Sequence, residues 1–321
     1  MRFLFYKWNA YMQNDLIENL QGLGHTVDCV IYAFHDYISD PFFERKFKKR
    51  IQQVSYDAVI SFNYFPIISN LCTACNIPYY SWIYDSPSPA LDCMDNPINR
   101  IFFFDKAEYL KYHDAGHQTV YHLPLAVDAS RIKKLQPSEE DISKYASDIS
   151  FVGQLYQNRQ GAHYQTAEKQ RTEALQELSK KHMVKLYSIY NTDTTNIPNV
   201  ICCGPVRYYT EMPLVFLLSK INLNITLPSI KTGIPLRALD ILGAKGFLLT
   251  NYQEELAQHF TDGKDLVFFH DTSDLCKKAA YYLEHEDERM QIVESGFEKV
   301  QQYYNYPRQI DAMFHLGGLT G

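Results

Sequence analysis

The chain has 321 residues, of which 46% are hydrophobic and 21% charged, and its formal net charge is −6. This length suggests two domains of ordinary size, and the composition is typical of a globular protein. The negative net charge argues against a nucleic-acid partner held by bulk positive charge. The basic run from Arg45 to Arg50 is more typical of a solvated helix face than of a membrane or polyanion contact.

The sequence also bears on the cellular compartment. Its amino terminus shows no signal-peptide pattern, and no apolar run approaches the length of a membrane span. The seven cysteines are odd in number and lack a framework spacing, which favours a reducing compartment. We therefore expect a cytoplasmic protein without a transmembrane segment, of unknown oligomeric state.

Short apolar segments alternate with amphipathic segments through the first part of the chain. The apolar segments predict strands over residues 2–6, 26–32, 57–62, 78–82, 100–104 and 118–122. The amphipathic segments predict helices over residues 14–23, 41–54, 66–74 and 106–113. Buried strands that alternate with helices predict a parallel, doubly wound sheet.

The same alternation begins again after a polar stretch. It predicts strands over residues 148–152, 184–188, 200–203, 221–227 and 266–270, and helices over residues 167–181, 212–219, 254–260, 273–283 and 287–304. We divide the chain into a Rossmann-like domain over residues 1–128, a linker over 129–147 and a second Rossmann-like domain over 148–304. A final helix at about 305–321 can pack back on the first domain. Two such α/β domains are expected to face a cleft, with ligands at the carboxyl ends of the strands.

The stretch TGIPLRALDILGAKGFLLT, residues 232–250, predicts a glycine turn, an amphipathic helix and a buried strand. Gly233, between Thr232 and Ile234, is expected where the helix begins, which suits an anion at a helix amino terminus. Arg237 can neutralise phosphate charge, and Asp240, three residues later, can accept hydrogen bonds from ribose. The alternative is an ordinary α/β connection with a surface salt bridge.

Polar residues also follow the predicted strands of the first domain. Trp8 and Asn9 follow the first strand, Asn63 the third, and Tyr84 and Asp85 the fourth. A carboxylate in an apolar loop is a candidate general base, so Asp85 is the predicted catalytic residue, and the other four are predicted on the acceptor side. The alternatives are simple turns and helix caps.

In the second domain Gly153 and Arg159 follow the first strand, where a positive charge suits a diphosphate. Tyr187 lies at the end of the strand predicted over 184–188 and Val206 follows the one over 200–203, and both are predicted to contact the base. The chain has neither the GxGxxG of a dinucleotide site, nor a GxSxG elbow, nor a phosphate-binding GxxxxGK motif. Its histidines are not clustered at metal-ligand spacing.

Several of these segments, in this order, resemble the CgeB-like (spore maturation protein) glycosyltransferases of GT-B fold. The segments are SFNYFP (61–66), YYSWIYDSP (79–87), FFFDKAEYLKYHDAGHQTVYHLPLAVD (102–128), DISFVGQLYQNR (148–159), INLNITL (221–227), GIPLRALDILGAKGFLLTNYQEEL (233–256) and DLVFFHDTSDL (265–275).

The resemblance implies a nucleotide-sugar donor in the second domain, an acceptor in the first, and no metal or other cofactor. Asp240 matches the second acid of the E-x7-E motif of related retaining enzymes, and Arg237 the arginine just before it. The first acid is replaced by Thr232, which leaves the identity of the donor sugar open. Gly153 and Arg159 look like the family's glycine and basic residue near the diphosphate.

We therefore expect a metal-independent glycosyltransferase that moves a sugar from a nucleoside diphosphate, with UDP favoured, to a hydroxyl of a glycan or protein. Analogy favours retention of the anomeric configuration, and in an inverting reaction Asp85 would be the base. Two alternatives stay open: a nucleotide-sugar epimerase of GT-B fold, and a non-catalytic spore or envelope assembly protein that keeps the fold.

Overall fold

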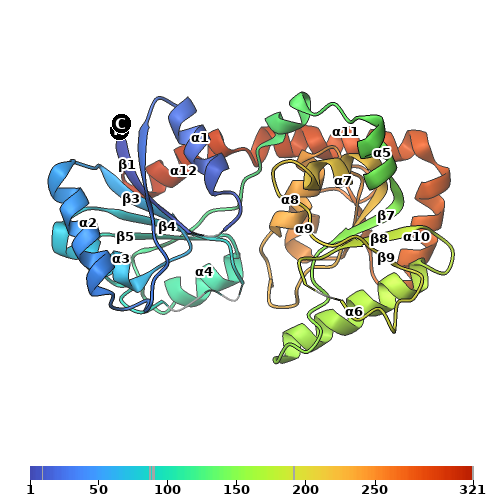
Figure 1. Ribbon diagram of the computed structural model, residues 1–321, viewed down its shortest axis with the longest axis horizontal. Helices are drawn as coiled ribbons and strands as arrows, with labels where there is room; N and C mark the ends of the chain where they lie inside the picture. The colour runs from blue at the N-terminus through green and yellow to red at the C-terminus, as the bar shows by residue number, and fades with distance from the viewer. Residues whose placement is uncertain (9, 87, 89–90, 191, 320–321) are drawn as a thin grey trace. The chain divides into compact units, whose positions relative to one another are not determined.

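The computed structural model describes residues 1–8, 10–86, 88, 91–190 and 192–319 (Figure 1). The chain forms two compact units, one made of Met1–Ala126 with Tyr306–Gly321 and the other of Val127–Asn305. No helix among the described residues is both long enough and apolar enough to cross a membrane.

The first unit is built on a six-stranded parallel sheet in the order β2-β1-β3-β4-β5-β6. Its strands are β1 (Arg2–Lys7), β2 (Thr26–Ile31), β3 (Ala58–Phe62), β4 (Tyr79–Ile83), β5 (Asn99–Phe103) and β6 (Val120–His122). Its helices are α1 (Gln13–Gly22), α2 (Pro41–Gln53), α3 (Pro66–Cys75), α4 (Lys106–His113) and α12 (Tyr306–Gly317). Every residue of β3 and β4 is buried, as expected for central strands covered on both faces.

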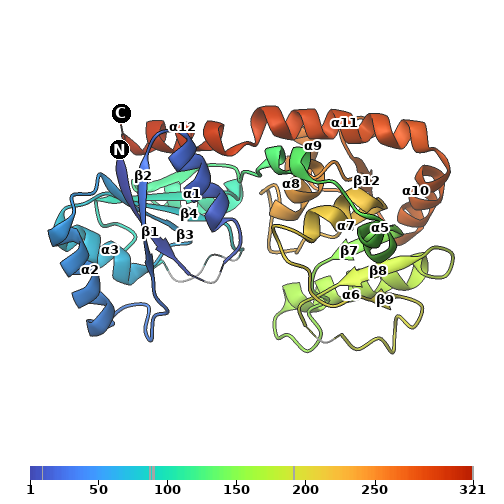
Figure 2. The ribbon, with the colours of Figure 1, turned by 45° about the horizontal axis from the view of Figure 1, so that its top comes forward.

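The last helix, α12, lies beside α1 in this unit (Figure 2). Phe314 packs on Phe3 with ring centroids 5.4 Å apart, and the Tyr80 hydroxyl donates to the carbonyl of Gly317 over 2.7 Å. A side chain at Gly317 would meet the Tyr80 ring, since an added Cβ lies 2.3 Å from it. Close packing against β4 therefore requires glycine at the end of this helix.

The second unit has its own six-stranded parallel sheet, in the order β12-β11-β10-β7-β8-β9. Its strands are β7 (Ser147–Val152), β8 (Val184–Tyr187), β9 (Ile201–Cys202), β10 (Ser219–Asn224), β11 (Leu248–Asn251) and β12 (Val267–Phe269). Its helices are η1 (Ala129–Lys134), α5 (Glu139–Tyr145), α6 (Ala162–Leu178), α7 (Met212–Leu218), α8 (Leu236–Gly243), α9 (Glu254–His259), α10 (Thr272–Glu284) and α11 (Glu286–Tyr303). Two Rossmann-like α/β units confirm the predicted fold class.

The segment expected as a linker, residues 129–147, is helical in the second unit, where it forms η1 and α5. Ser138 begins α5 with a capping box, because its side chain accepts from the Asp141 amide and the Asp141 carboxylate accepts from the Ser138 amide. Asp128 begins η1 in a similar way by accepting from the Ser130 amide over 3.0 Å. These local caps stabilise helices within a sequence that looks like a polar connection.

Candidate functional site

Helix α8 begins at Leu236, so the prediction that Gly233 opens it is wrong by three residues. Pro235 occupies the N-cap position, and a residue that precedes proline is disfavoured in the α region. Ile234 is buried, and the proline that follows it disfavours a helix start at that residue. Gly233 is buried in the approach to the helix, and its neighbour Thr232 is partly exposed.

Arg237 and Asp240 lie on one face of α8, as their spacing predicts. Arg237 Nη1 donates to Asp240 Oδ2 over 3.1 Å. The arginine side chain is 29% exposed and the aspartate side chain 4%, so the pair is no surface salt bridge. Arg237 also contacts the sulfur of Met212 at 2.6 Å and lies over the Phe216 ring at 5.6 Å.

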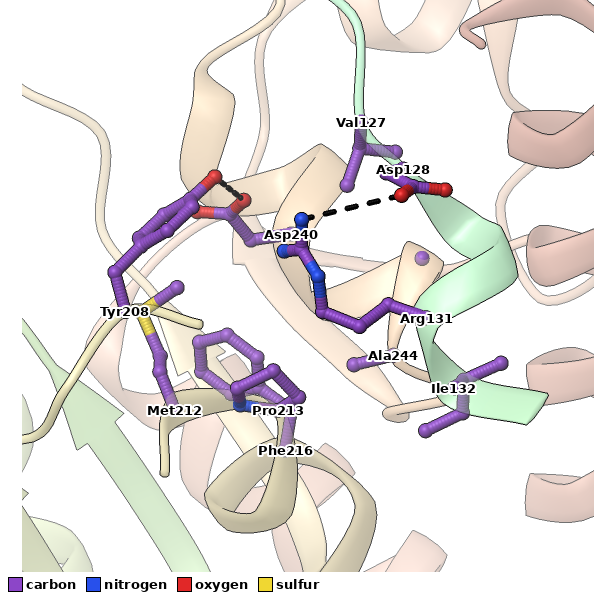
Figure 3. A pocket seen from close by; sticks show the side chains of 11 residues that line it. Val127, Asp128, Arg131, Ile132, Tyr208, Met212, Pro213, Phe216, Asp240 and Ala244 are labelled. Carbon is purple, nitrogen blue, oxygen red and sulfur yellow. Dashed lines mark hydrogen bonds and ion pairs between the residues drawn. The ribbon is translucent and has the colours of Figure 1, made fainter. Parts of the chain in front are cut away.

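The carboxylate of Asp240 has further partners that the sequence did not indicate. The Tyr208 hydroxyl donates to Asp240 Oδ1 over 2.8 Å, and Arg131 of η1 lies close by (Figure 3). Burial raises the pKa of the Asp240 carboxyl, while Arg237, Tyr208 and Arg131 oppose that shift. The pocket beside it holds only about 20 Å³, the room of a water molecule. A ribose contact by Asp240 thus stays a prediction, and it would require Tyr208 to move.

The most unusual charge of the second unit is Arg171 on α6, which we did not predict. Only 7% of the residue is exposed, and its Nη1 and Nη2 donate to the carbonyls of Gln154 and Ile225, both over 2.5 Å. These carbonyls follow the ends of β7 and β10, and Nε is buried without a partner. Burial lowers the pKa of Arg171 and the nearby charge of Arg237 lowers it further, whereas Tyr156 opposes the shift.

A sequence signal for Arg171 does exist. The buried face of α6 carries Ala167, Ala174, Leu175 and Leu178, and Arg171 falls on that stripe, four residues after Ala167. An arginine within an apolar helical stripe is rarely solvated. The presence of a charged residue on this apolar stripe could have identified Arg171 as a buried arginine from the sequence.

A pocket of about 390 Å³ opens beside Arg171, at the carboxyl ends of β7 and β8. Gln154 and Tyr156 line it, and the Arg171 guanidinium lies 4.8 Å from the centre of the Tyr156 ring. Arg159 is exposed, lines the same pocket and lies over the Tyr190 ring at 5.5 Å. Gly153 immediately follows β7, and its amide donates to the Tyr187 carbonyl over 3.0 Å. The structure therefore brings the predicted Gly153 and Arg159 to one strand edge.

The two predicted base-binding residues differ in accessibility. Tyr187 ends β8 and is only 3% exposed, with its hydroxyl buried beside Cys203. Burial raises its pKa, and neither Tyr187 nor the partly exposed Val206 lines the 390 Å³ pocket. The aromatic residue at that pocket is Tyr190, which is 50% exposed.

In the first unit the predicted catalytic residue and the described acceptor-side residues lie together. Asn63 directly follows β3, is buried, and adopts the left-handed conformation with φ of 57° that asparagine tolerates well. Its Nδ2 donates to Asp85 Oδ2 over 2.6 Å, and its Oδ1 accepts from the Tyr84 amide over 3.2 Å. Desolvation by the surrounding protein raises the pKa of the Asp85 carboxyl, and the Asn63 hydrogen bond opposes the shift, while the residue itself is exposed at its surface.

Asp85 and Asn63 line a pocket of about 370 Å³ whose other walls are largely aromatic. Trp8 lines it and is fixed by a 3.0 Å hydrogen bond from its indole nitrogen to the Phe62 carbonyl. Tyr84 packs against Trp8 with ring centroids 6.3 Å apart. Asn9, also predicted on the acceptor side, lies outside the described residues. A carboxylate of raised pKa beside an aromatic pocket can accept a proton from a bound hydroxyl.

Within the described part of the chain, His, Cys, Asp and Glu side chains form no group of three or more that could hold a metal ion.

Comparison with known proteins places this geometry in context. Residues 169–315, a little under half of the chain, match a family described as glycosyl transferase-like. No curated protein sequence matches the chain.

Solved structures match almost the whole chain. A glycosyltransferase from Rickettsia africae has a TM-score of 0.70 at 11% identity, with 98% of both chains covered. Sucrose-phosphate synthase from Thermosynechococcus elongatus has a TM-score of 0.68 at 10% identity, also with 98% of both chains covered. Anabaena HepE in complex with UDP and glucose has a TM-score of 0.65 at 10% identity, over 98% of both chains. These likenesses show the fold, two Rossmann-like α/β units as in those GT-B enzymes.

Proposed function

We propose that this protein transfers a sugar from a UDP-sugar to a hydroxyl of a glycan or protein acceptor. Within the GT-B enzymes we assign it to the CgeB-like group, on the motifs quoted above. The supporting observation is Arg171, a guanidinium buried at the carboxyl ends of two parallel strands with no carboxylate partner among the described residues.

An unpaired buried charge is costly unless another group neutralises it. The two carbonyls that Arg171 contacts are dipoles and carry no full negative charge. Arg237 adds a second positive charge nearby, and its only carboxylate partner among the described residues is Asp240. A diphosphate at the 390 Å³ pocket would supply the missing negative charge, with Arg171 as a fixed positive charge behind Gln154 and Tyr156.

The same charges would assist the chemistry. When the bond between the sugar and the diphosphate breaks, negative charge grows on the leaving oxygen, and prearranged cations stabilise it. Asp85 is assigned to the acceptor hydroxyl. With retention of configuration, which analogy favours, it positions that hydroxyl; with inversion it also takes the proton. The proposal includes no metal and no cofactor besides the nucleotide-sugar substrate.

Thermal unfolding with UDP, GDP and TDP tests the proposal, because a ligand that binds only the folded state stabilises it by about 2.7 kcal/mol at a hundred times its dissociation constant. We expect UDP to raise the melting temperature in the presence of EDTA, and uridine, which has no phosphate, to have a much smaller effect. If no nucleoside diphosphate stabilises the protein, the proposal fails.

The role of Arg171 has a matched control in Arg289, which is 5% exposed and likewise donates to a backbone carbonyl, that of Tyr282. Both Arg171→Gln and Arg289→Gln remove a buried guanidinium from the second unit. Only Arg171→Gln should weaken UDP binding, by roughly 10- to 150-fold, the equivalent of about 1.5–3 kcal/mol. Equal UDP affinities in the two variants would contradict the assignment.

A further inference from the structure

The outer face of α2 combines basic and aromatic side chains. Phe42, Arg45, Lys46 and Lys49 are all exposed, and their spacing of three, four and seven residues places them on one face of the helix. The opposite face is anchored in the core by Phe43 and Phe47, both fully buried. The helix therefore presents this face without depending on it for folding.

The cations of this face have no acidic partner in the part of the chain that the structure describes. Among the described residues Arg45, Lys46 and Lys49 form no ion pair, whereas Lys48, on another side of the helix, lies 3.8 Å from Glu44. Arg50, at the end of the basic run, pairs with Asp28 at 3.2 Å. Three unpaired cations on one helix face of a chain with net charge −6 form a local positive patch.

Apolar side chains are exposed at the start of α2 and in the turn that precedes it. Tyr37, Ile38 and Phe42 are 61%, 58% and 64% exposed. The turn that carries two of them is held by Asp36, whose Oδ1 accepts from the Ile38 amide over 2.7 Å. Phe42 stacks on Tyr32, with ring centroids 6.1 Å apart. Phe42 therefore exposes its ring on the helix face that carries the cations, and Tyr37 and Ile38 are exposed in the turn before the helix.

We propose that the α2 face, defined as Tyr37, Ile38, Phe42, Arg45, Lys46 and Lys49, binds the surface of an anionic phospholipid bilayer. The cations match the negative headgroups, and the aromatic and aliphatic side chains enter the boundary between headgroups and acyl chains. A nucleic acid could use the cations and stack a base on Phe42, but it would leave the aliphatic Ile38 in water. The proposal does not depend on the proposed sugar transfer.

Cosedimentation of the full chain with vesicles tests this surface. We expect binding to phosphatidylcholine vesicles that contain about one-third phosphatidylglycerol, and little binding to phosphatidylcholine alone. The triple variant Arg45→Gln/Lys46→Gln/Lys49→Gln should lower the partition coefficient about 100-fold, because each basic residue near an anionic surface contributes about five-fold. Phe42→Ser should weaken the binding that persists at about 1 M salt, where charge is screened within ~3 Å.

The matched control is Lys169→Gln/Lys180→Gln/Lys181→Gln, which removes three exposed charges from the second unit. It should bind vesicles like the unchanged protein. The proposal is overturned if the unchanged protein does not bind anionic vesicles at low salt, if the α2-face triple variant binds them normally, or if both triple variants lose binding equally. Binding to single-stranded RNA without binding to vesicles would instead assign the patch to a polyanion.

Discussion

Replacing Asp85 by asparagine separates a catalytic carboxylate from a structural one. The Asp85 carboxylate accepts a 2.6 Å hydrogen bond from Asn63 and borders the 370 Å³ aromatic pocket. Asparagine keeps the size of the side chain and can still accept that hydrogen bond, but it cannot accept a proton from a bound hydroxyl. The structural cost is the difference between a charge-assisted and a neutral hydrogen bond, about 1–1.5 kcal/mol.

The expected loss of activity is larger. If Asp85 is a general base, its removal lowers turnover roughly 10²- to 10⁴-fold, which corresponds to about 2.7–5.5 kcal/mol in the activation free energy. UDP affinity should be nearly unchanged, because Asp85 belongs to the first unit and the proposed diphosphate site to the second. Turnover is measured as UDP release in the presence of an accepted glycan, and folding by urea denaturation.

The raised pKa of Asp85 adds a test with a defined sign. Its folded pKa exceeds its unfolded value, so its contribution to stability is fully present below the unfolded pKa and is lost as pH rises through the folded pKa. At neutral pH Asp85→Asn removes the unfavourable ionisation of this carboxyl. This gain in folding stability offsets part of the stability lost through the weaker hydrogen bond to Asn63. In the unchanged enzyme kcat/KM should fall at acid pH as Asp85 is protonated, at a higher pH than for an ordinary aspartate.

The acid limb should be absent in Asp85→Asn. The control is Asp114→Asn, which removes an exposed carboxylate from the end of α4 in the same unit and should leave turnover unchanged. Full turnover in a folded Asp85→Asn variant, or an acid limb that persists in it, would refute the reasoning and leave Asp85 as a hydrogen-bond partner of Asn63.

Three further outcomes are expected. Arg237→Ala should weaken UDP binding by roughly 10- to 150-fold in calorimetry on the folded variant; an unchanged affinity would reduce Arg237 to the partner of Asp240. Asp240→Asn should weaken donor binding by about 1–3 kcal/mol. Unchanged donor binding in this variant would mean that Asp240 does not contact the ribose. Gly296→Ala in α11 should lower the free energy of unfolding by about 1–3 kcal/mol in urea, because its Cβ would lie 2.2 Å from the Asp265 carbonyl oxygen; unchanged stability would mean that the helix shifts freely.

The sequence by itself determined the parallel sheets and the order of their elements, since both depend on local patterns. Buried parallel strands are continuous apolar runs, and some of the helices between them, such as α2, α4 and α10, begin at an aspartate cap. Helix α4 has the predicted bounds Lys106–His113, with the Asp105 side chain accepting from the amides of its first turn. Strand-end positions also followed from this pattern, which is why Asn63 and Asp85 could be expected near one another.

Tertiary packing decided which groups the charged side chains at the strand ends contact and how deeply those side chains are buried. Arg171 meets the Ile225 carbonyl, 54 residues away, only because the fold brings α6 to the segments that follow β7 and β10. Tyr208, 32 residues from Asp240, closes the space around that carboxylate. Burial and long-range contacts set the pKa of a side chain, and a local pattern contains neither. The role proposed for each motif residue therefore depends on contacts with residues that are distant in the sequence and meet only in the folded protein.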